Sequence, residues 1–206
     1  MEFWDISNSS KTTKKNDTNK EKEDSKNGSS EKHENTIYFY EDIDDGTILN
    51  LIKNIKECDI DLIKKEAEFG LENSIIPIYI NVNSNGGNII DSFIAYDTIL
   101  NSKRQIITTV HGLAASSATF ITLAGNKRRI TKNSYMLIHQ LSGFSFGTYN
   151  EIKDHNENIT KIMNRMKRIY KERTKLDKKE LAYLINHDLY MDSEECLKKG
   201  FVDEII

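Results

Sequence analysis

The balance of hydrophobic and polar residues changes near residue 37. Residues 5–36 are rich in Lys, Glu, Asp, Asn, Ser and Thr and hold almost no apolar side chains. Such a segment buries too little apolar surface to offset an ordering cost of about 1–2 kcal/mol per residue. We therefore expect residues 1–36 to form a disordered charged tail and residues 37–206 to form one folded domain.

Beyond residue 37, runs of β-branched and aromatic residues alternate with amphipathic segments, which predicts alternating strands and helices. The expected strands cover 37–40, 75–82, 106–110, 127–131, 135–138 and 201–206. The expected helices cover 47–58, 88–100, 119–124, 149–174, 176–185 and 192–199. The fourth and fifth strands are separated by a short turn, so we expect them to pair as a hairpin. The alternation is typical of an α/β fold with βαβ connections.

The composition of the chain narrows the range of functions to be expected. The net charge of −3 is too small to indicate nucleic-acid binding, and no apolar run is long enough to span a membrane. Only Cys58 and Cys196 are present and no secretory signal is visible, so we expect free thiols and a cytoplasmic location. No His/Cys/Asp cluster has metal-ligand spacing and no GxxxxGK[ST] phosphate loop occurs, so no metal or cofactor is expected.

One stretch carries candidate chemistry. Ser116 and Ser117 follow the 106–110 strand and precede a short helix, and His139 ends the 135–138 strand. A hydroxyl becomes a good nucleophile when an imidazole accepts its proton and a third group holds that imidazole. Small residues at such a junction also allow close packing, and a histidine at a strand end is often structural. Spacing alone leaves both interpretations open.

Four further segments carry motifs in a fixed order: residues 79–87 (YINVNSNGG), 112–118 (GLAASSA), 136–140 (MLIHQ), and 187–203, which begins HDLYMDSEEC and ends GFVD. Together they resemble the ClpP family, the proteolytic subunits of the Clp protease. The resemblance covers residues 37–206. It implies a ClpP/crotonase-like α/β fold, a spiral of repeated β-β-α units with a protruding long handle helix at 149–174.

The resemblance also assigns candidate site residues. It implies a catalytic triad of Ser116 as nucleophile, His139 as base and Asp188 as the group that orients the base. It implies that the backbone N–H groups of Gly87 and Ser117 form the oxyanion hole. The segment after His139 is implied to bind substrate through Gln140, Leu141, Ser142 and Gly143. The resemblance thus predicts a serine endopeptidase that hydrolyses peptide bonds without ATP.

Assembly and partners are likewise implied by the family. ClpP subunits form stacked rings, usually heptameric, that enclose their active sites, so a homo-oligomer acting on peptides or unfolded proteins is expected. An AAA+ unfoldase is the implied partner that would deliver substrates and consume the ATP. Neither nucleic acid nor membrane is expected as a partner.

Three other interpretations remain. The chain could be a non-catalytic structural subunit of a mixed Clp-like ring, although all three triad residue types are present. A crotonase shares the fold but acts on acyl-CoA, and we find no pocket motif for an adenine nucleotide. The Asn85 that replaces the family's loop proline, and the short segment between Gly125 and His139, resemble divergent phage or large-virus members. A viral maturation protease in the host cytoplasm is therefore a further alternative.

Overall fold

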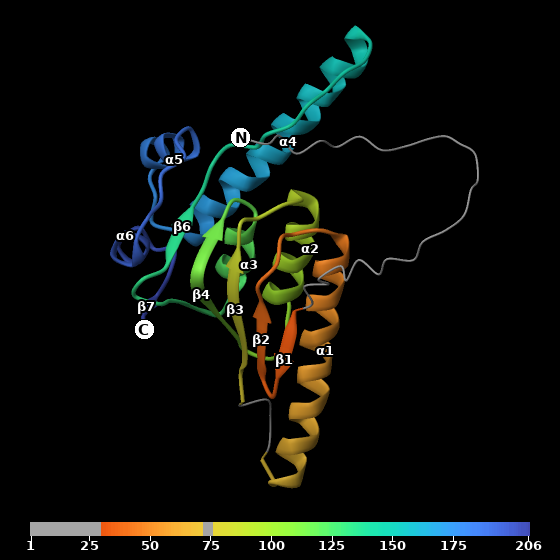
Figure 1. Ribbon diagram of the computed structural model, residues 1–206, viewed down its shortest axis with the longest axis vertical. Helices are drawn as coiled ribbons and strands as arrows, with labels where there is room; N and C mark the ends of the chain where they lie inside the picture. The colour runs from red at the N-terminus through yellow and green to blue at the C-terminus, as the bar shows by residue number, and fades with distance from the viewer. Residues whose placement is uncertain (1–29, 72–75) are drawn as a thin grey trace, which may run out of the picture.

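One mostly parallel sheet organises the chain in the computed structural model, which describes residues 30–71 and 76–206 (Figure 1). Its strands are β1 (Glu31–His33), β2 (Thr36–Phe39), β3 (Ile78–Ser84), β4 (Ile106–Ala115), β5 (Lys127–Ile130), β6 (Tyr135–Leu137) and β7 (Glu204–Ile205). The strand order is β1-β2-β3-β4-β5-β7, with β6 paired to β4. Only the β1–β2 pair is antiparallel among the named strands. The α/β fold expected from the resemblance is confirmed.

The expected hairpin between residues 127–131 and 135–138 is wrong. Both β5 and β6 run parallel to β4, one after the other along the same strand, with Val110 opposite Ile130 and Ala114 opposite Met136. The turn between them does not reverse the chain. It is closed by a bond from Ser134 N–H to the Thr131 carbonyl, and Ser134 Oγ accepts the N–H of Gly112. The turn therefore ties itself to β4 and carries the chain onward beside that strand.

The helices lie close to the predicted positions. They are α1 (Asp45–Glu68), α2 (Ile89–Leu100), α3 (Ala118–Ala124), α4 (Tyr149–Arg173), α5 (Lys178–Ile185) and α6 (Ser193–Lys199). Side-chain caps set several of these boundaries: Asp44, Thr148 and Asp192 each form a capping box at a helix start. Helix α1 continues ten residues past the predicted end because its later turns still bury Leu62 and Glu66.

The folded unit includes residues before the predicted boundary at residue 37. Strand β1 pairs with β2, so residues 30–36 belong to the folded unit, whereas residues 1–29 lie outside the described residues. Polar contacts to α1, instead of apolar packing, hold residues 30–33 in place. Lys32 Nζ lies 2.9 Å from Asp61 of α1, and Asn54 donates to both the hydroxyl and the carbonyl of Ser30. Hydropathy alone could not predict a strand held by such contacts.

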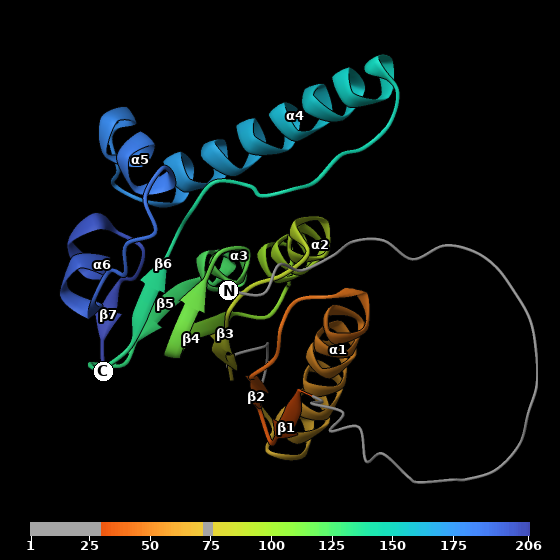
Figure 2. The same ribbon diagram turned by 45° about the horizontal axis from the view of Figure 1, so that its top comes forward.

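Helix α4 is anchored at one end and projects away from the sheet at the other (Figures 1 and 2). At the anchored end Tyr170 is fully buried, with its ring centroid 5.0 Å from Phe120 of α3 and 6.2 Å from Phe201. Phe120 in turn lies 5.4 Å from Phe93 of α2. The projecting end is more open, since Phe144, Phe146 and Tyr149 are more than 80% exposed. This is the shape expected of the handle helix.

A buried arginine joins α1 to the starts of β3 and β4. Arg104 is 1% exposed, and its guanidinium forms two bonds to Glu66, of 2.7 and 3.0 Å. It also donates to Asp59 at 2.6 Å and to the Ile76 carbonyl at 2.8 Å. The bond to Glu66 is the main cause that raises the pKa of Arg104 above its usual value. The network therefore holds a permanent positive charge inside the fold.

Replacing this arginine is expected to destabilise the fold. Arg104→Met would remove the guanidinium that bonds twice to the buried Glu66 carboxylate, and breaking a buried ion pair typically costs about 3–5 kcal/mol. The matched control is Arg129→Met, which breaks the partly exposed bond to Glu204 and should change the free energy of unfolding by only about 0–1 kcal/mol. Urea denaturation of both variants measures the difference. Equal losses in the two variants would contradict a stabilising role for the buried network.

No helix within 30–71 and 76–206 is both long and apolar enough to cross a membrane.

Candidate active site

Ser116 occupies a strained turn between β4 and α3. Its φ of 53° places a non-glycine residue in the left-handed region, which costs on the order of 1–3 kcal/mol and is common at functional sites. The turn is held by a 2.8 Å bond from Ser116 N–H to the Leu137 carbonyl of β6. Such a strand-to-helix turn presents a serine Oγ at the end of a parallel sheet. Within the described residues, this Oγ forms no hydrogen bond.

The carbonyl of Ser116 is held by a buried relay from α4. Thr119 Oγ1 donates to the Ser116 carbonyl at 2.6 Å, and the Tyr170 hydroxyl lies 2.7 Å from the same Thr119 oxygen. Because Thr119 already donates its only hydroxyl hydrogen to Ser116, the Tyr170 hydroxyl donates to Thr119. Burial raises the pKa of Tyr170, so the hydroxyl keeps this hydrogen. The nucleophile turn is therefore linked directly to the anchored end of the handle helix.

The glycine loop after β3 lies against this turn. A Cβ on Gly86 would come within 2.8 Å of both the Ala115 carbonyl and Ser116 Cβ, and the φ of Gly86 is +100°. Gly87 has a φ of +148°, and a Cβ there would overlap the Ile43 carbonyl. Both positions therefore require glycine because backbone from other segments approaches so closely.

The predicted oxyanion donors have free N–H groups. Across the described part of the chain, neither the Gly87 N–H nor the Ser117 N–H donates a hydrogen bond. Gly87 belongs to the loop that packs on the nucleophile turn, and Ser117 follows Ser116 directly. Two free amides beside a candidate nucleophile are what an oxyanion hole needs.

Strand pairing brings His139 and Asp188 to the same end of the sheet as Ser116. Residue Met136 of β6 exchanges two backbone bonds with Met191, of 2.8 and 2.9 Å, in an antiparallel bridge. His139 is three residues after Met136 and Asp188 is three residues before Met191. The bridge is isolated, and the next bond between the two segments, from Gln140 N–H to the Ile185 carbonyl, is out of register with it. The pairing therefore brings the two segments side by side near His139 and Asp188 without setting these two residues opposite each other.

The three residues of the predicted triad are not joined by hydrogen bonds among the described residues. Among the described residues, no bond links Ser116 to His139 or His139 to Asp188. His139 Nδ1 instead donates to the Gln140 carbonyl at 2.7 Å. Because a carbonyl can only accept, this bond requires the proton to be on Nδ1 and leaves Nε2 as the basic nitrogen. That is the tautomer a general base needs.

The predicted substrate segment runs along the handle helix. Residues 140–148 form no strand and lie beside α4 (Figure 2). The Leu141 N–H points to Met163 Sδ at 3.2 Å, and Gly143 lies near Ile159 and His155. Ser142 and Gly143 are exposed. An exposed extended segment has backbone groups available to pair with an extended peptide.

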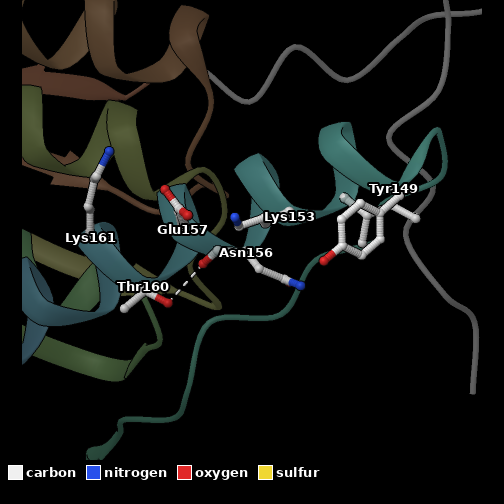
Figure 3. A pocket seen from close by; sticks show the side chains of 7 residues that line it. Tyr149, Lys153, Asn156, Glu157, Thr160 and Lys161 are labelled. Carbon is white, nitrogen blue, oxygen red and sulfur yellow. Dashed lines mark hydrogen bonds between the residues drawn. The ribbon is translucent and has the colours of Figure 1, made fainter.

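A surface hollow of about 680 Å³ lies on the projecting part of α4 (Figure 3). It is lined by Tyr149, Ile152, Lys153, Asn156, Glu157, Thr160 and Lys161. None of the candidate catalytic or oxyanion residues borders it. It belongs to one face of a helix, so we do not regard it as the active site.

Sequence reasoning missed three groups at the site: the hydroxyl of Ser117, the Thr119–Tyr170 pair, and Ile43, which brackets the glycine loop. No local signal marks them, because their partners lie 30 to 51 residues away or, for Ile43, in another loop.

As for metal binding, no group of three or more His, Cys, Asp or Glu side chains is placed to hold an ion in 30–71 and 76–206.

A parallel α/β sheet with a serine on a strained strand-to-helix turn is an architecture that hydrolases use. A family model described as Clp protease matches residues 31–206, and the chain therefore belongs to the Clp protease family. Membership makes it a ClpP-like protease, a hydrolase whose substrates are peptides or proteins. Ring-shaped oligomers are typical of this family.

Proposed function

We propose that this protein is a serine endopeptidase of the ClpP type that cleaves peptide bonds without ATP. The observation that carries the proposal is the geometry around Ser116. Its Oγ is unbonded within the described residues, two free N–H groups flank it, and the histidine at the end of the neighbouring strand has its basic nitrogen free.

The proposed mechanism is acyl transfer. Ser116 Oγ attacks the peptide carbonyl while His139 Nε2 takes its proton and later gives it to the leaving amine. Asp188 orients His139 and stabilises the imidazolium. The N–H groups of Gly87 and Ser117 stabilise the oxyanion of the tetrahedral intermediate. Water activated by His139 then releases the acyl-enzyme.

Substrate would bind in extended form along the segment after His139. We propose that backbone groups of Gln140, Leu141, Ser142 and Gly143 pair with the peptide. The 3.2 Å approach of Leu141 N–H to a methionine sulfur is a weak contact that a peptide carbonyl could replace. This would align the scissile bond with Ser116.

Assembly into a ring is part of the proposal. We propose a homo-oligomer of stacked rings, each heptameric as is usual in the ClpP family. The rings would enclose the active sites and admit only unfolded chains. An AAA+ unfoldase would deliver these chains. Cys58 and Cys196 are buried free thiols, which supports a reducing compartment, and we place the protein in the cytoplasm, or the host cytoplasm if it is viral.

The proposal is tested by incubating the purified full chain with short fluorogenic peptides and with unfolded casein, without nucleotide. We expect the peptides to be cleaved, and casein more slowly, by a particle whose mass is that of a ring. A natively folded globular protein of the same size as casein should resist cleavage. A ring-sized particle that cleaves no peptide would contradict the proposal and favour a non-catalytic subunit of a mixed ring.

A further inference from the structure

The two proposed oxyanion donors come from different parts of the chain. Gly87 lies in the loop between β3 and α2, whereas Ser117 lies between β4 and α3. An oxyanion hole works only if both N–H groups point at one oxygen, 2.7–3.1 Å away. Something must therefore fix the glycine loop relative to the nucleophile turn.

A buried side chain makes that connection. Ser117 is 2% exposed, and its Oγ donates to the Gly87 carbonyl at 3.1 Å. The same residue thus supplies one free N–H and holds, through its hydroxyl, the residue that supplies the other.

The other hydrogen bonds of the glycine loop do not connect it to the nucleophile turn. The peptide group before Gly87 is fixed by a 2.8 Å bond from Ile43 N–H to the Gly86 carbonyl. On the other side, Asn88 N–H donates to the Ile43 carbonyl at 2.8 Å. These bonds tie the loop to Ile43 and not to the nucleophile turn. Among the hydrogen bonds of the described residues, the Ser117 hydroxyl alone joins the Gly86-Gly87 pair to that turn.

The Gly87 N–H lies in the peptide group that also holds the Gly86 carbonyl, so the bond from Ile43 sets its direction within the loop. That bond does not set where the loop lies relative to the nucleophile turn. The Ser117 hydroxyl holds the next peptide group of the loop, through the Gly87 carbonyl, against that turn. Losing this bond would let the flexible glycine pair, and the Gly87 N–H with it, shift away from the oxyanion.

We propose that the Ser117 hydroxyl is a positioning group that aligns the Gly87 N–H with the N–H of Ser117 itself. The inference rests on the proposed function. Ser117 is on this account a residue with two roles, a backbone donor to the oxyanion and a side-chain tie that fixes the second donor.

The test compares two serine-to-alanine variants of the full chain. Ser117→Ala removes the tie but keeps the backbone N–H. The matched control is Ser193→Ala, because Ser193 is also buried, at 4% exposure, and also donates to a distant backbone carbonyl, that of Lys132 at 3.0 Å. Lys132 precedes β6, at the opposite end of that strand from His139.

Two readouts are needed. The first is kcat and KM for a short fluorogenic peptide. The second is hydrogen–deuterium exchange of the peptide spanning residues 84–88, which reports the loop whether or not the protein is active. We expect Ser117→Ala to lower kcat by roughly 10–100-fold, somewhat less than the 10²–10³-fold loss of a whole donor, and to leave KM within about twofold. We expect faster exchange at Asn88 in this variant only.

Equal kcat and equal exchange in Ser117→Ala and Ser193→Ala would overturn the inference. The proposed function fails separately, through absence of peptide cleavage by the unmodified chain. In that case the exchange data still decide: faster exchange in Ser117→Ala supports the tie, and unchanged exchange rejects it.

Discussion

Replacing Ser116 with alanine is expected to lower kcat for peptide hydrolysis by about 10⁴–10⁶-fold, because the reaction loses its nucleophile. His139→Ala should lower kcat by a similar factor, since the hydroxyl then has no base. The double variant should be no worse than either single one, because nucleophile and base act as a unit. Steady-state cleavage of a fluorogenic peptide by equal amounts of assembled particle measures all three.

The control for these variants is Ser193→Ala, which removes a buried hydroxyl that bonds to the Lys132 carbonyl and to none of the candidate site residues, and it should keep full activity. Assembly must be checked by particle mass, because a variant that does not assemble could lose activity indirectly. Hydrolysis that persists at more than a few per cent in assembled Ser116→Ala would show that another group carries the chemistry.

Replacing Asp188 with asparagine is expected to lower kcat by about 10⁴-fold. The amide can present an N–H to His139 Nδ1 and so stabilise the tautomer with its proton on Nε2, which cannot accept the proton of Ser116. This prediction is sharp because the chain has a competing acceptor: the Gln140 carbonyl already holds Nδ1–H at 2.7 Å. The account requires Asp188 to replace that carbonyl in the working enzyme.

The neighbouring histidine provides the matched control for Asp188→Asn. His187 is exposed, and its Nδ1 donates to the Tyr183 carbonyl, away from the site. His187→Gln should change kcat by less than about twofold. If Asp188→Asn behaved like His187→Gln, the Gln140 carbonyl would be the orienting group and the triad assignment of Asp188 would be wrong.

Local patterns predicted the elements well. The sequence predicts a helix at 149–174, and α4 spans Tyr149–Arg173, because its apolar repeat and the Thr148 cap are both local features. Asn88, the first residue of the predicted 88–100 helix, is the N-cap of α2 for the same reason. Strand partners are not local, and the hairpin was therefore predicted wrongly. Nothing within 127–138 reveals that both strands align with β4.

The candidate site was predicted as residues but not as contacts. Ser116, His139 and Gly87 can be named from the resemblance, and the pairing of β4 with β6 places Ser116 and His139 at the same end of the sheet. The bond from Ser117 to Gly87 joins residues 30 positions apart, and the Thr119–Tyr170 bond joins residues 51 apart. Each pairs common polar residues that give no sign of a partner. Such contacts follow only from the packed fold.

The most direct test of Ser116 as an activated nucleophile is covalent labelling of the assembled protein with a fluorophosphonate serine probe. Peptide mass spectrometry then locates the adduct, and the particle mass is measured in the same sample. The account predicts a single adduct on Ser116 of a ring-sized particle, and its loss in both Ser116→Ala and His139→Ala. A ring-sized particle without an adduct, or with the adduct on another serine, would contradict the account.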